Sequence, residues 1–586
     1  MLGKNRLKGR DPSNNITVPK PSFFNWIRQY NRSTLSDDSM AALIVTIMLI
    51  PQSLAYALLA GLPPEVGLYA SILPLIAYAL FGSSMTLAVG PVAVISLMTA
   101  AAVSQVALPG TPEYLGAAIL LSLLSGVMLI GLGLARAGFL ANLLSHPVIS
   151  GFISASAVLI AFSQLKHVLG VPVSGHDLPS ILSDLATHLG DANLPTMIIG
   201  SLSVIFLFWV RSGLKPLLLR FGAPEELAGT LTKAGPVLAV IVTTAIVSLF
   251  ALDQTGVSIV GEIPAGLPAP SLPPLDLGLA RELIPAAFLI SLVGFVESVS
   301  VGHTLAARRR ERIRPNQELI GLGAANLASG LGGGFPVTGG FSRSVVNFDA
   351  GARTPMAGVF TAVMIALTAL FLTPWFEYLP KAVLAATVIV AVLSLVDFAA
   401  IRRVWIFSKS DFLAMSTTIV VVLGIGVEAG IIAGILVSIG SLLARIARPH
   451  FAVIGQIPGT QHYRNKNRHA VLQSEKVLAI RLDEMLYFLN GHTFEDAVGE
   501  LISENNALTD LVLLCHGINE IDASGLEVLE SINARLDGLG IRFHLSEVKG
   551  PVMDRLNRVG FKDHLTGQIF LSHHEAMQTL DPAQPE

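Results

Sequence analysis

The segment from Gly332 to Gly351 reads GGGFPVTGGFSRSVVNFDAG, and it interrupts a chain that is otherwise strongly apolar. Glycines and a proline, which disfavour a continuous helix, precede Arg343, and long apolar runs lie on both sides of this charged residue. A helix that begins inside a membrane exposes its first backbone N–H groups, which lipid cannot satisfy. Such a helix end must therefore line a polar cavity or pack within protein.

The composition indicates that most of the chain is embedded in a membrane. Of the 586 residues, 52% are hydrophobic and 13% are charged, and the mean hydropathy is +0.65. Soluble domains carry roughly 25% charged residues. The chain has one cysteine, Cys515, which excludes an internal disulfide and a cysteine metal site. No metal-ligand cluster or nucleophile–base pattern is evident, so we expect no enzyme, no cofactor and no metal.

Apolar segments of the length that a spanning helix needs, roughly 20 residues, recur fourteen times, although two of them are short or broken by glycine. They cover residues 39–60, 66–82, 91–106, 115–135, 147–166, 194–210, 235–252, 283–305, 316–331, 342–349, 355–374, 380–397, 411–427 and 429–447. Lysine and arginine gather in the loops on one side of this arrangement, as in the run from Arg308 to Arg314. This bias predicts that both termini are cytoplasmic.

The chain changes character near Pro449. From about residue 476, short apolar strands such as KVLAIRL alternate with amphipathic helices such as SGLEVLESINARLDGLG. Such alternation over about 100 residues indicates a compact α/β domain. We therefore divide the chain into a cytoplasmic N-terminal segment (1–38), a transmembrane domain (39–447), a linker with the start of the soluble domain (448–475) and the soluble domain itself (476–580).

Two broken apolar segments occupy corresponding positions in the two halves of the membrane domain. The Gly90-Pro91 break follows the start of the first span by about 51 residues, and the Gly339–Phe341 break follows the start of the eighth span by about 57 residues. Interrupted spans at matching positions are typical of inverted repeats. With seven spans in each half, the second half would enter the membrane upside down.

Two helix starts that face each other inside the membrane, at Pro91 and Ser342, would form an anion site. Each helix start carries roughly half a positive charge, and its backbone N–H groups bind anions. Arg343 adds a full positive charge, which a bound anion would neutralise. The alternative at this point is an ordinary loop from which Arg343 reaches to the membrane surface.

Five longer motifs resemble the sulfate permease family of anion transporters. They are IPQSLAYALLAGLPPEVGLYASILP (50–74), AVGPVAVISLM (88–98), GFVESVSVG (294–302), NQELIGLGAANLASG (316–330) and FPVTGGFSRSVVN (335–347). In the soluble domain, INEIDASGLEVLE (518–530) resembles the sulfate transporter and anti-sigma factor antagonist (STAS) domain that this family carries.

The resemblance implies a polytopic α-helical membrane protein of two inverted seven-span repeats, with a C-terminal α/β STAS domain. It implies a core of spans 1–4 and 8–11, a gate of spans 5–7 and 12–14, and a substrate site between the half-helices of spans 3 and 10. The residues that the motifs assign to substrate binding are Gln52, Tyr56, Val92, Ala93, Ser342 and Arg343. Many relatives carry phenylalanine at the positions of Tyr56 and Val92, so the polarity of the pocket and the choice of substrate stay open.

Glu297 is a carboxylate within an apolar span, where an ionisable residue is functional by default. A proton on Glu297 beside a bound anion would bring the loaded transporter closer to neutrality. Moving an anion into a cell that is negative inside costs about 2.3 kcal/mol per charge per 100 mV, so an importer needs such help. In bacterial relatives, acidic residues on this span couple transport to protons or sodium. The structural alternative is a neutral glutamic acid that hydrogen-bonds to a neighbouring span.

These features together favour a secondary active transporter of the inner (plasma) membrane. We expect it to import sulfate or a similar small anion with protons, by an elevator-type movement of core against gate. The alternatives are a bicarbonate, dicarboxylate or chloride transporter or exchanger, an anion channel, and a membrane-tethered STAS signalling protein.

The expected partners are the anion, protons, membrane lipid and a second copy of the chain in a homodimer, without nucleic acid. Two further positions have a structural and a functional interpretation. Ser524 lies where antagonist proteins are phosphorylated, but a serine that opens a helix is usually a cap. The segment from Pro315 to Glu318 matches the family, but it also fits an ordinary helix start.

Overall fold

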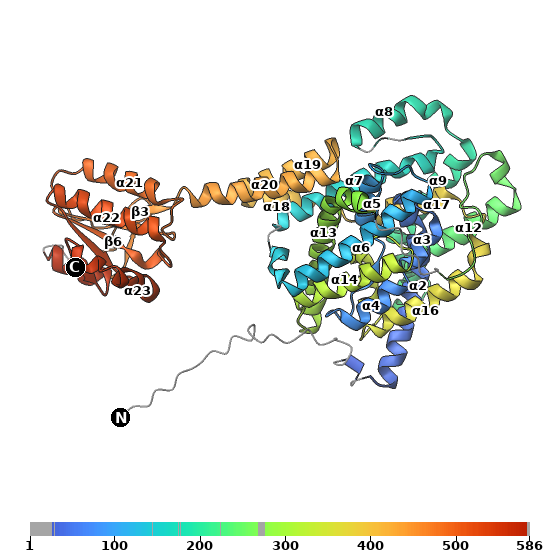
Figure 1. The fold of residues 1–586 in the computed structure, drawn as a ribbon, viewed down its shortest axis with the longest axis horizontal. Helices are drawn as coiled ribbons and strands as arrows, with labels where there is room; N and C mark the ends of the chain where they lie inside the picture. The colour runs from blue at the N-terminus through green and yellow to red at the C-terminus, as the bar shows by residue number, and fades with distance from the viewer. Residues whose placement is uncertain are drawn as a thin grey trace. The chain divides into compact units, whose positions relative to one another are not determined.

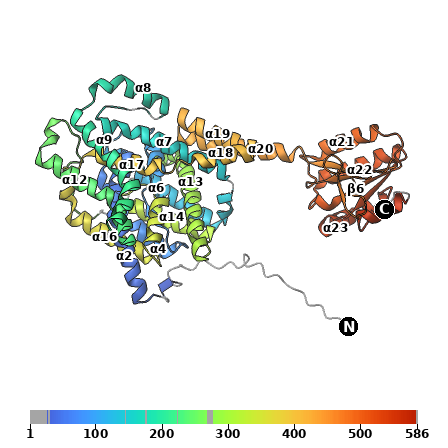
Figure 2. The ribbon, with the colours of Figure 1, turned by 180° about the vertical axis from the view of Figure 1, so that it is seen from behind.

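The computed structural model describes residues 26–27, 30–142, 145–173, 175, 177–222, 224–267 and 276–582. The chain divides into two compact units, Met1–Ser438 and Ile439–Glu586. We call the first the membrane domain and the second the soluble domain (Figures 1 and 2). Most of the predicted N-terminal segment lies outside the described residues.

Among the described residues of the first half of the membrane domain, the regular elements are helices and one very short strand. Its elements are α2 (Arg32–Leu59), α3 (Pro64–Tyr69), α4 (Leu73–Phe81), β1 (Val89–Gly90), α5 (Ala93–Val103), α6 (Pro112–Leu134), α7 (His146–Leu169), α8 (Leu178–His188), α9 (Leu194–Trp209), α10 (Lys215–Arg220), α11 (Glu225–Lys233) and α12 (Gly235–Leu249). Several of these helices begin with proline in the first turn, where its missing N–H removes no helical hydrogen bond. Thr111, for example, caps α6 and accepts a hydrogen bond from the Tyr114 backbone N–H.

The second half repeats this pattern, including a short strand before a short helix. Its elements are α13 (Leu277–Arg309), α14 (Pro315–Leu331), β2 (Thr338–Gly339), α15 (Phe341–Asp349), α16 (Met356–Phe371), α17 (Lys381–Leu393), α18 (Phe398–Phe407), α19 (Lys409–Gly424) and α20 (Val427–Ile446). The boundary between the two units falls within α20.

Eight helical segments among the described residues are long and apolar enough to cross a membrane, and α5, α12 and α16 are shorter apolar helices. Every one of the fourteen predicted spans coincides with a helix or, for the second span, with the pair α3 and α4. The count of fourteen stays a prediction, because a helix as short as α15 does not cross a membrane by itself. Four helices, α8, α10, α11 and α18, lie in connections where the sequence predicted none.

The most extensive helix packing in the membrane domain lies within the predicted core and within the predicted gate, although α17 of the gate also packs against α2 of the core. In the core, α14 packs against α4 and α6, and α16 packs against α2. In the gate, α17 packs against α7 and α9, and α19 packs against α7. Glycines allow the closest approaches: a Cβ atom added at Gly323 would lie 2.6 Å from Ile130 and 2.8 Å from the Gly126 carbonyl oxygen.

The two broken segments meet as an antiparallel pair of strands. Val89 of β1 pairs with Gly339 of β2, and Gly90 pairs with Thr338. Each strand leads directly into a short helix, α5 or α15. We call this pairing of β1 with β2 the crossing. It brings the starts of two helices together, although they are about 250 residues apart in sequence.

The soluble domain contains a six-stranded sheet in the order β4-β3-β5-β6-β7-β8. Its strands are β3 (Phe451–Gln456), β4 (Tyr463–Asn465), β5 (Val477–Leu482), β6 (Asp510–Leu514), β7 (Arg542–Ser546) and β8 (Ile569–Phe570), and its helices are α21 (Gly491–Ser503), α22 (Ala523–Gly538), α23 (Gly550–Arg558), α24 (Phe561–His564) and α25 (His573–Leu580). Strands β5 to β8 are parallel, whereas β3 is antiparallel to both of its neighbours. Two strands thus lie within the range predicted as linker and domain start.

Candidate functional site: a cavity at the crossing of two half-helices

The helix starts at the crossing present free backbone donors. Helix α5 begins at Ala93 after Val92, and α15 begins at Phe341 after Gly340; neither preceding residue supplies a side-chain cap. The first N–H groups of each helix therefore have no partner within the helix or from a capping side chain. The sequence placed these starts at Pro91 and Ser342, within two residues of the observed positions.

A cavity of about 50 Å³ adjoins these helix starts. A water molecule needs roughly 10–15 Å³, so the cavity can hold a few waters or one small ion. It is lined by Gln52, Tyr56, Val92, Ala93, Val94, Glu297, Gly340, Phe341, Ser342, Arg343, Ala391, Val392 and Leu395. All six residues predicted for substrate binding, and the residue predicted for proton coupling, line this one cavity.

Arg343 is the charged group at the centre of this arrangement. Its side chain is 2% exposed, and within the described part of the chain neither Nη1 nor Nη2 has a hydrogen-bond partner. Two glycines make room for it: a Cβ atom at Gly90 would lie 2.8 Å from Nη1, and one at Gly340 would lie 3.1 Å from Nη2. Its burial excludes the alternative in which Arg343 reaches the membrane surface. A buried charge without hydrogen bonds is costly, and an anion in the cavity would remove that cost.

Helix α13 carries Glu297 and also holds β2 in place. Thr338 Oγ1 donates a hydrogen bond to the Gly294 carbonyl oxygen at 2.6 Å. Ser298 Oγ lies 2.7 Å from Thr338 Oγ1 and accepts a hydrogen bond from the Gly339 backbone N–H at 2.9 Å. The half-buried Glu297 therefore sits on a helix that is tied to the strand leading to Arg343.

A second set of polar side chains ties α15 and β2 to their neighbours. Ser344 Oγ donates to the Gly340 carbonyl oxygen and accepts from the Ala88 backbone N–H. Asn347 Nδ2 donates to the carbonyl oxygen of Thr86 at 3.0 Å. The Asn326 side chain of α14 bonds both the N–H and the carbonyl oxygen of Val337. The sequence analysis did not single out these residues; small polar side chains inside apolar helices were the signal that could have found them.

The opposite wall of the cavity comes from Ala391 and Val392 of α17 and from Leu395 just beyond it. Helix α17 belongs to the predicted gate, whereas α2, α5, α13 and α15 belong to the predicted core. The cavity therefore lies between the two groups of helices. No sequence signal marked the gate residues, because an apolar side chain in an apolar span looks like packing.

Glu318, in the first turn of α14, has a structural role. Its buried carboxylate accepts hydrogen bonds from Tyr78 Oη at 2.7 Å and from the Ser83 backbone N–H at 2.8 Å. It thereby joins α14 to the end of α4. This agrees with the structural interpretation of the segment that begins at Pro315, although Glu318 bonds a neighbouring segment rather than its own helix end.

In the soluble domain, the cap of α22 differs from the sequence interpretation. Asp522, not Ser524, is the capping residue, and its carboxylate accepts a hydrogen bond from the Gly525 backbone N–H at 2.8 Å. Ser524 lies half-buried within the first turn. An aspartate two positions earlier reaches the free N–H groups better than a serine already inside the helix. Phosphorylation of Ser524 stays a prediction.

Among the described residues, no group of three or more histidine, cysteine, aspartate or glutamate side chains could hold a metal ion. The chemistry available at the crossing is therefore that of backbone N–H groups, one guanidinium, one carboxyl group and the polar side chains of Gln52, Tyr56 and Ser342. Such a set can bind an anion and hold a proton.

Comparison with known proteins decides the family. The model of the sulfate permease family matches residues 35–418, and that of the STAS domain matches residues 469–576. The chain belongs to the sulfate permease family. This confirms the resemblance seen in the motifs and identifies a multi-pass membrane transporter family rather than an enzyme.

Curated relatives match nearly the whole chain. Sulfate transporter 4.1, chloroplastic, of Arabidopsis thaliana is 35% identical over 570 residues, which cover 95% of this chain and 82% of that protein. A probable sulfate transporter of Mycobacterium tuberculosis is 34% identical over 556 residues, covering 94% of this chain and 96% of that protein.

Solved structures show the same fold. The structure of SLC26A9 superposes with a TM-score of 0.87 at 24% identity and covers 96% of this chain and 93% of that one. The transmembrane domain of the cyanobacterial bicarbonate transporter BicA gives a TM-score of 0.58 at 22% identity, with coverage of 70% of this chain and 99% of that one. These likenesses confirm a helical membrane domain of the transporter type followed by a STAS domain.

Proposed function

We propose that this sulfate permease family member is a secondary active transporter that imports sulfate, or a similar small anion, across the plasma membrane. The observation that carries the proposal is the buried Arg343 guanidinium, whose terminal nitrogens lack partners among the described residues and which lines a cavity at two uncapped helix starts. The names of the curated relatives, sulfate transporters of a plant and a bacterium, support sulfate as the substrate.

In this proposal the anion binds at the crossing of β1 and β2. Arg343 supplies the positive charge, and the backbone N–H groups at Val92, Ala93 and Ser342 donate hydrogen bonds from the two helix starts. Gln52 and Tyr56 lie one turn apart on α2 and close the site from one side.

Coupling to protons is proposed for Glu297, because its carboxyl group and the Arg343 guanidinium line the same small cavity. With Glu297 ionised, Arg343 is already neutralised and an anion adds a net negative charge. With Glu297 protonated, the arginine balances a monovalent anion, or one of the two negative charges of sulfate. Binding of anion and proton would then favour one another, which is the condition for moving both together.

The movement we propose is a displacement of the core helices against the gate helices, because the cavity has walls from both groups. The soluble STAS domain would be cytoplasmic, as would the N-terminus, and would assist formation of a homodimer. The described residues that line the cavity all belong to the unit Met1–Ser438.

The test is uptake of radiolabelled anions by the purified protein in liposomes, with and without an inward proton gradient. We expect sulfate or another small anion to accumulate only when the gradient is present. Equal uptake without any gradient or counter-anion would instead favour an anion channel. Uptake that requires a counter-anion inside would favour an exchanger.

A further inference from the structure

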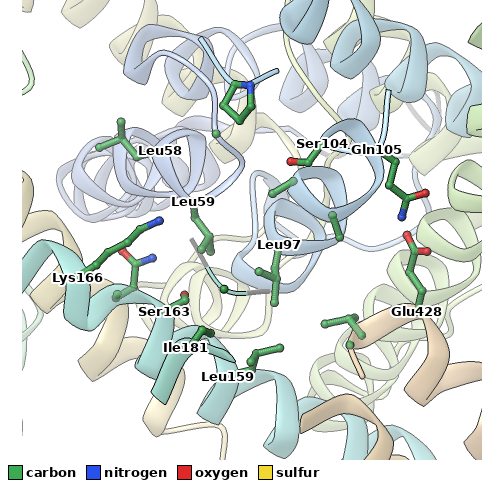
Figure 3. Close-up of a pocket in the computed structure, with 18 of the residues that line it drawn as sticks. Leu58, Leu59, Leu97, Ser104, Gln105, Leu159, Ser163, Lys166, Ile181 and Glu428 are labelled. Carbon is green, nitrogen blue, oxygen red and sulfur yellow. The ribbon is translucent and has the colours of Figure 1, made fainter. Parts of the chain in front are cut away.

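A second and larger cavity, of about 510 Å³, lies at the end of α2 that is remote from the N-terminus. Its walls come from the ends of α2 and α5 and the start of α6 on the core side, and from α7, α8 and the start of α20 on the gate side. Figure 3 shows Leu59, Leu97 and Leu159 between its two polar ends. We call it the outer cavity, since the proposed topology places it on the outer side of the membrane.

The outer cavity and the crossing share two helices. Helix α2 contributes Tyr56 to the cavity at the crossing and Leu59 to the outer cavity, and α5 contributes Val94 and Leu97 in the same way. Three residues along a helix correspond to about 4.5 Å. The linings of the two cavities therefore come within about one helical turn of each other along α2 and α5, and leucine side chains near this point would hinder passage of a hydrated ion.

One end of the outer cavity is positively charged. Lys166, in the last turn of α7, supplies the charge, and the neighbouring His167 lines the same end. The Lys166 ammonium donates to the Val173 carbonyl oxygen at 3.5 Å, which is longer than a good hydrogen bond. The largely buried Gln164 lines the cavity from the same helix and adds an amide donor near the ammonium, whereas the Ser163 hydroxyl already donates to the Ile160 carbonyl oxygen at 2.8 Å.

Lysine and arginine residues are few on the predicted outer side of the membrane. In the predicted outer loops and helix ends, the lysines and arginines are Lys166, Arg281 and Lys381, as the bias of positive charge toward the cytoplasm leads one to expect. Of these three, Lys166 lines the outer cavity. Glu428 and Gln105 lie together at the far end, away from Lys166 (Figure 3), so an anion is directed to the lysine end.

We propose that the outer cavity is a second anion site, where Lys166 holds a small inorganic anion before it reaches the crossing. This inference rests on the proposed function. A purely structural role for Lys166 would be to complement the negative end of the α7 dipole, and the two roles differ in what they predict for anion binding.

The direct test is equilibrium binding of radiolabelled sulfate, and separately of radiolabelled chloride, to the purified full chain. We expect Arg343→Ala to retain one weak site for the anion. Adding Lys166→Gln should abolish that residual binding, whereas adding Arg281→Gln, which removes an exposed outer cation away from the cavity, should not. Lys166→Arg should preserve it, because the charge remains.

Transport supplies the second readout. Lys166→Gln should raise the KM for anion on the outer side roughly fivefold, as expected for loss of one partly screened charge, with little change in the maximal rate. The difference should shrink at high salt, and Arg281→Gln should behave like the wild type.

The outcomes separate this inference from the proposed function. If Arg343→Ala binds no anion, or if Lys166→Gln cannot be told from Arg281→Gln, the outer site is wrong while transport at the crossing stands. If Arg343→Ala transports like the wild type, the proposed function fails, and loss of binding in Lys166→Gln would still support the outer site.

Discussion

At the scale of single residues, Arg343 needs a hydrogen-bond partner from within the cavity, either water or an anion. The guanidinium is buried and its terminal nitrogens lack partners within the described residues. In native proteins such a group has a specific explanation, such as a functional role or a bound ion or water, and an anion would satisfy both the charge and the donors of Arg343.

We therefore expect Arg343→Ala to weaken anion binding by about 2 kcal/mol or more, roughly thirtyfold, because a charge-assisted hydrogen bond contributes about 1.5–3 kcal/mol. Arg343→Lys should lose less, since it keeps the charge but not the planar pair of donors. Binding of radiolabelled sulfate to each purified variant measures the difference. Undiminished uptake by Arg343→Ala in liposomes would rule out this assignment.

Glu297 can be tested with a substitution that imitates its protonated form. Glu297→Gln keeps the shape and much of the hydrogen bonding of a neutral carboxyl group, but it cannot release a proton. If Glu297 couples transport to protons, this variant should bind anion and still exchange one anion for another, while accumulation driven by a pH gradient is lost. If the residue is only structural, glutamine should preserve gradient-driven uptake.

The measurement is uptake at fixed internal pH while the external pH is lowered. Glu282→Gln is the matched control, because it removes an exposed carboxylate from the same helix. Equal stimulation by acid in the wild type and in Glu297→Gln would leave Glu297 without a coupling role.

At the scale of structural elements, the crossing depends on side chains that form hydrogen bonds with its backbone N–H and carbonyl groups. Ser298 Oγ accepts the hydrogen bond of the Gly339 N–H at 2.9 Å in a buried setting. Removal of the hydroxyl in Ser298→Ala leaves that N–H without its partner, at a cost of about 1–3 kcal/mol. We expect a lower melting temperature and weaker anion binding. Ser300→Ala, at an exposed position of the same helix, should change neither; a similar effect of both would argue against the role of Ser298.

Elements that interrupt a run of apolar residues could be predicted from the sequence. Elements and residues that fit their surroundings in the sequence could not. Glycine and proline inside apolar runs marked both half-helices, and a charge inside a span marked Arg343 and Glu297. Helix α8, by contrast, is short and amphipathic within a polar connection. Leu395, on the gate side of the cavity, is one apolar residue among many. Ser298 and Thr338 lie within motifs that resemble the family, but the reason for a polar side chain at each position is visible only from their hydrogen bonds in the structure.

At the scale of the whole molecule, the described lining of the site belongs to one of the two compact units. Every residue that lines the cavity at the crossing lies within the unit Met1–Ser438, which has its own hydrophobic core. The soluble domain has another core, built on the sheet from β3 to β8. The overall fold was easier to predict from the sequence than single elements or residues, because motifs that resemble the family occur along the whole chain in the same order as in the family.

A chain that ends before residue 450 should therefore fold and bind anion with nearly the affinity of the full chain, because no side chain at the crossing is removed. We expect it to transport as well, with weaker dimer formation and altered regulation. The measurements are sulfate binding, uptake in liposomes, and mass in detergent by light scattering, each beside the full chain. If the shortened protein binds anion normally but cannot move it, the soluble domain takes part in the transport cycle itself. Its movement would then be coupled to that of the core helices.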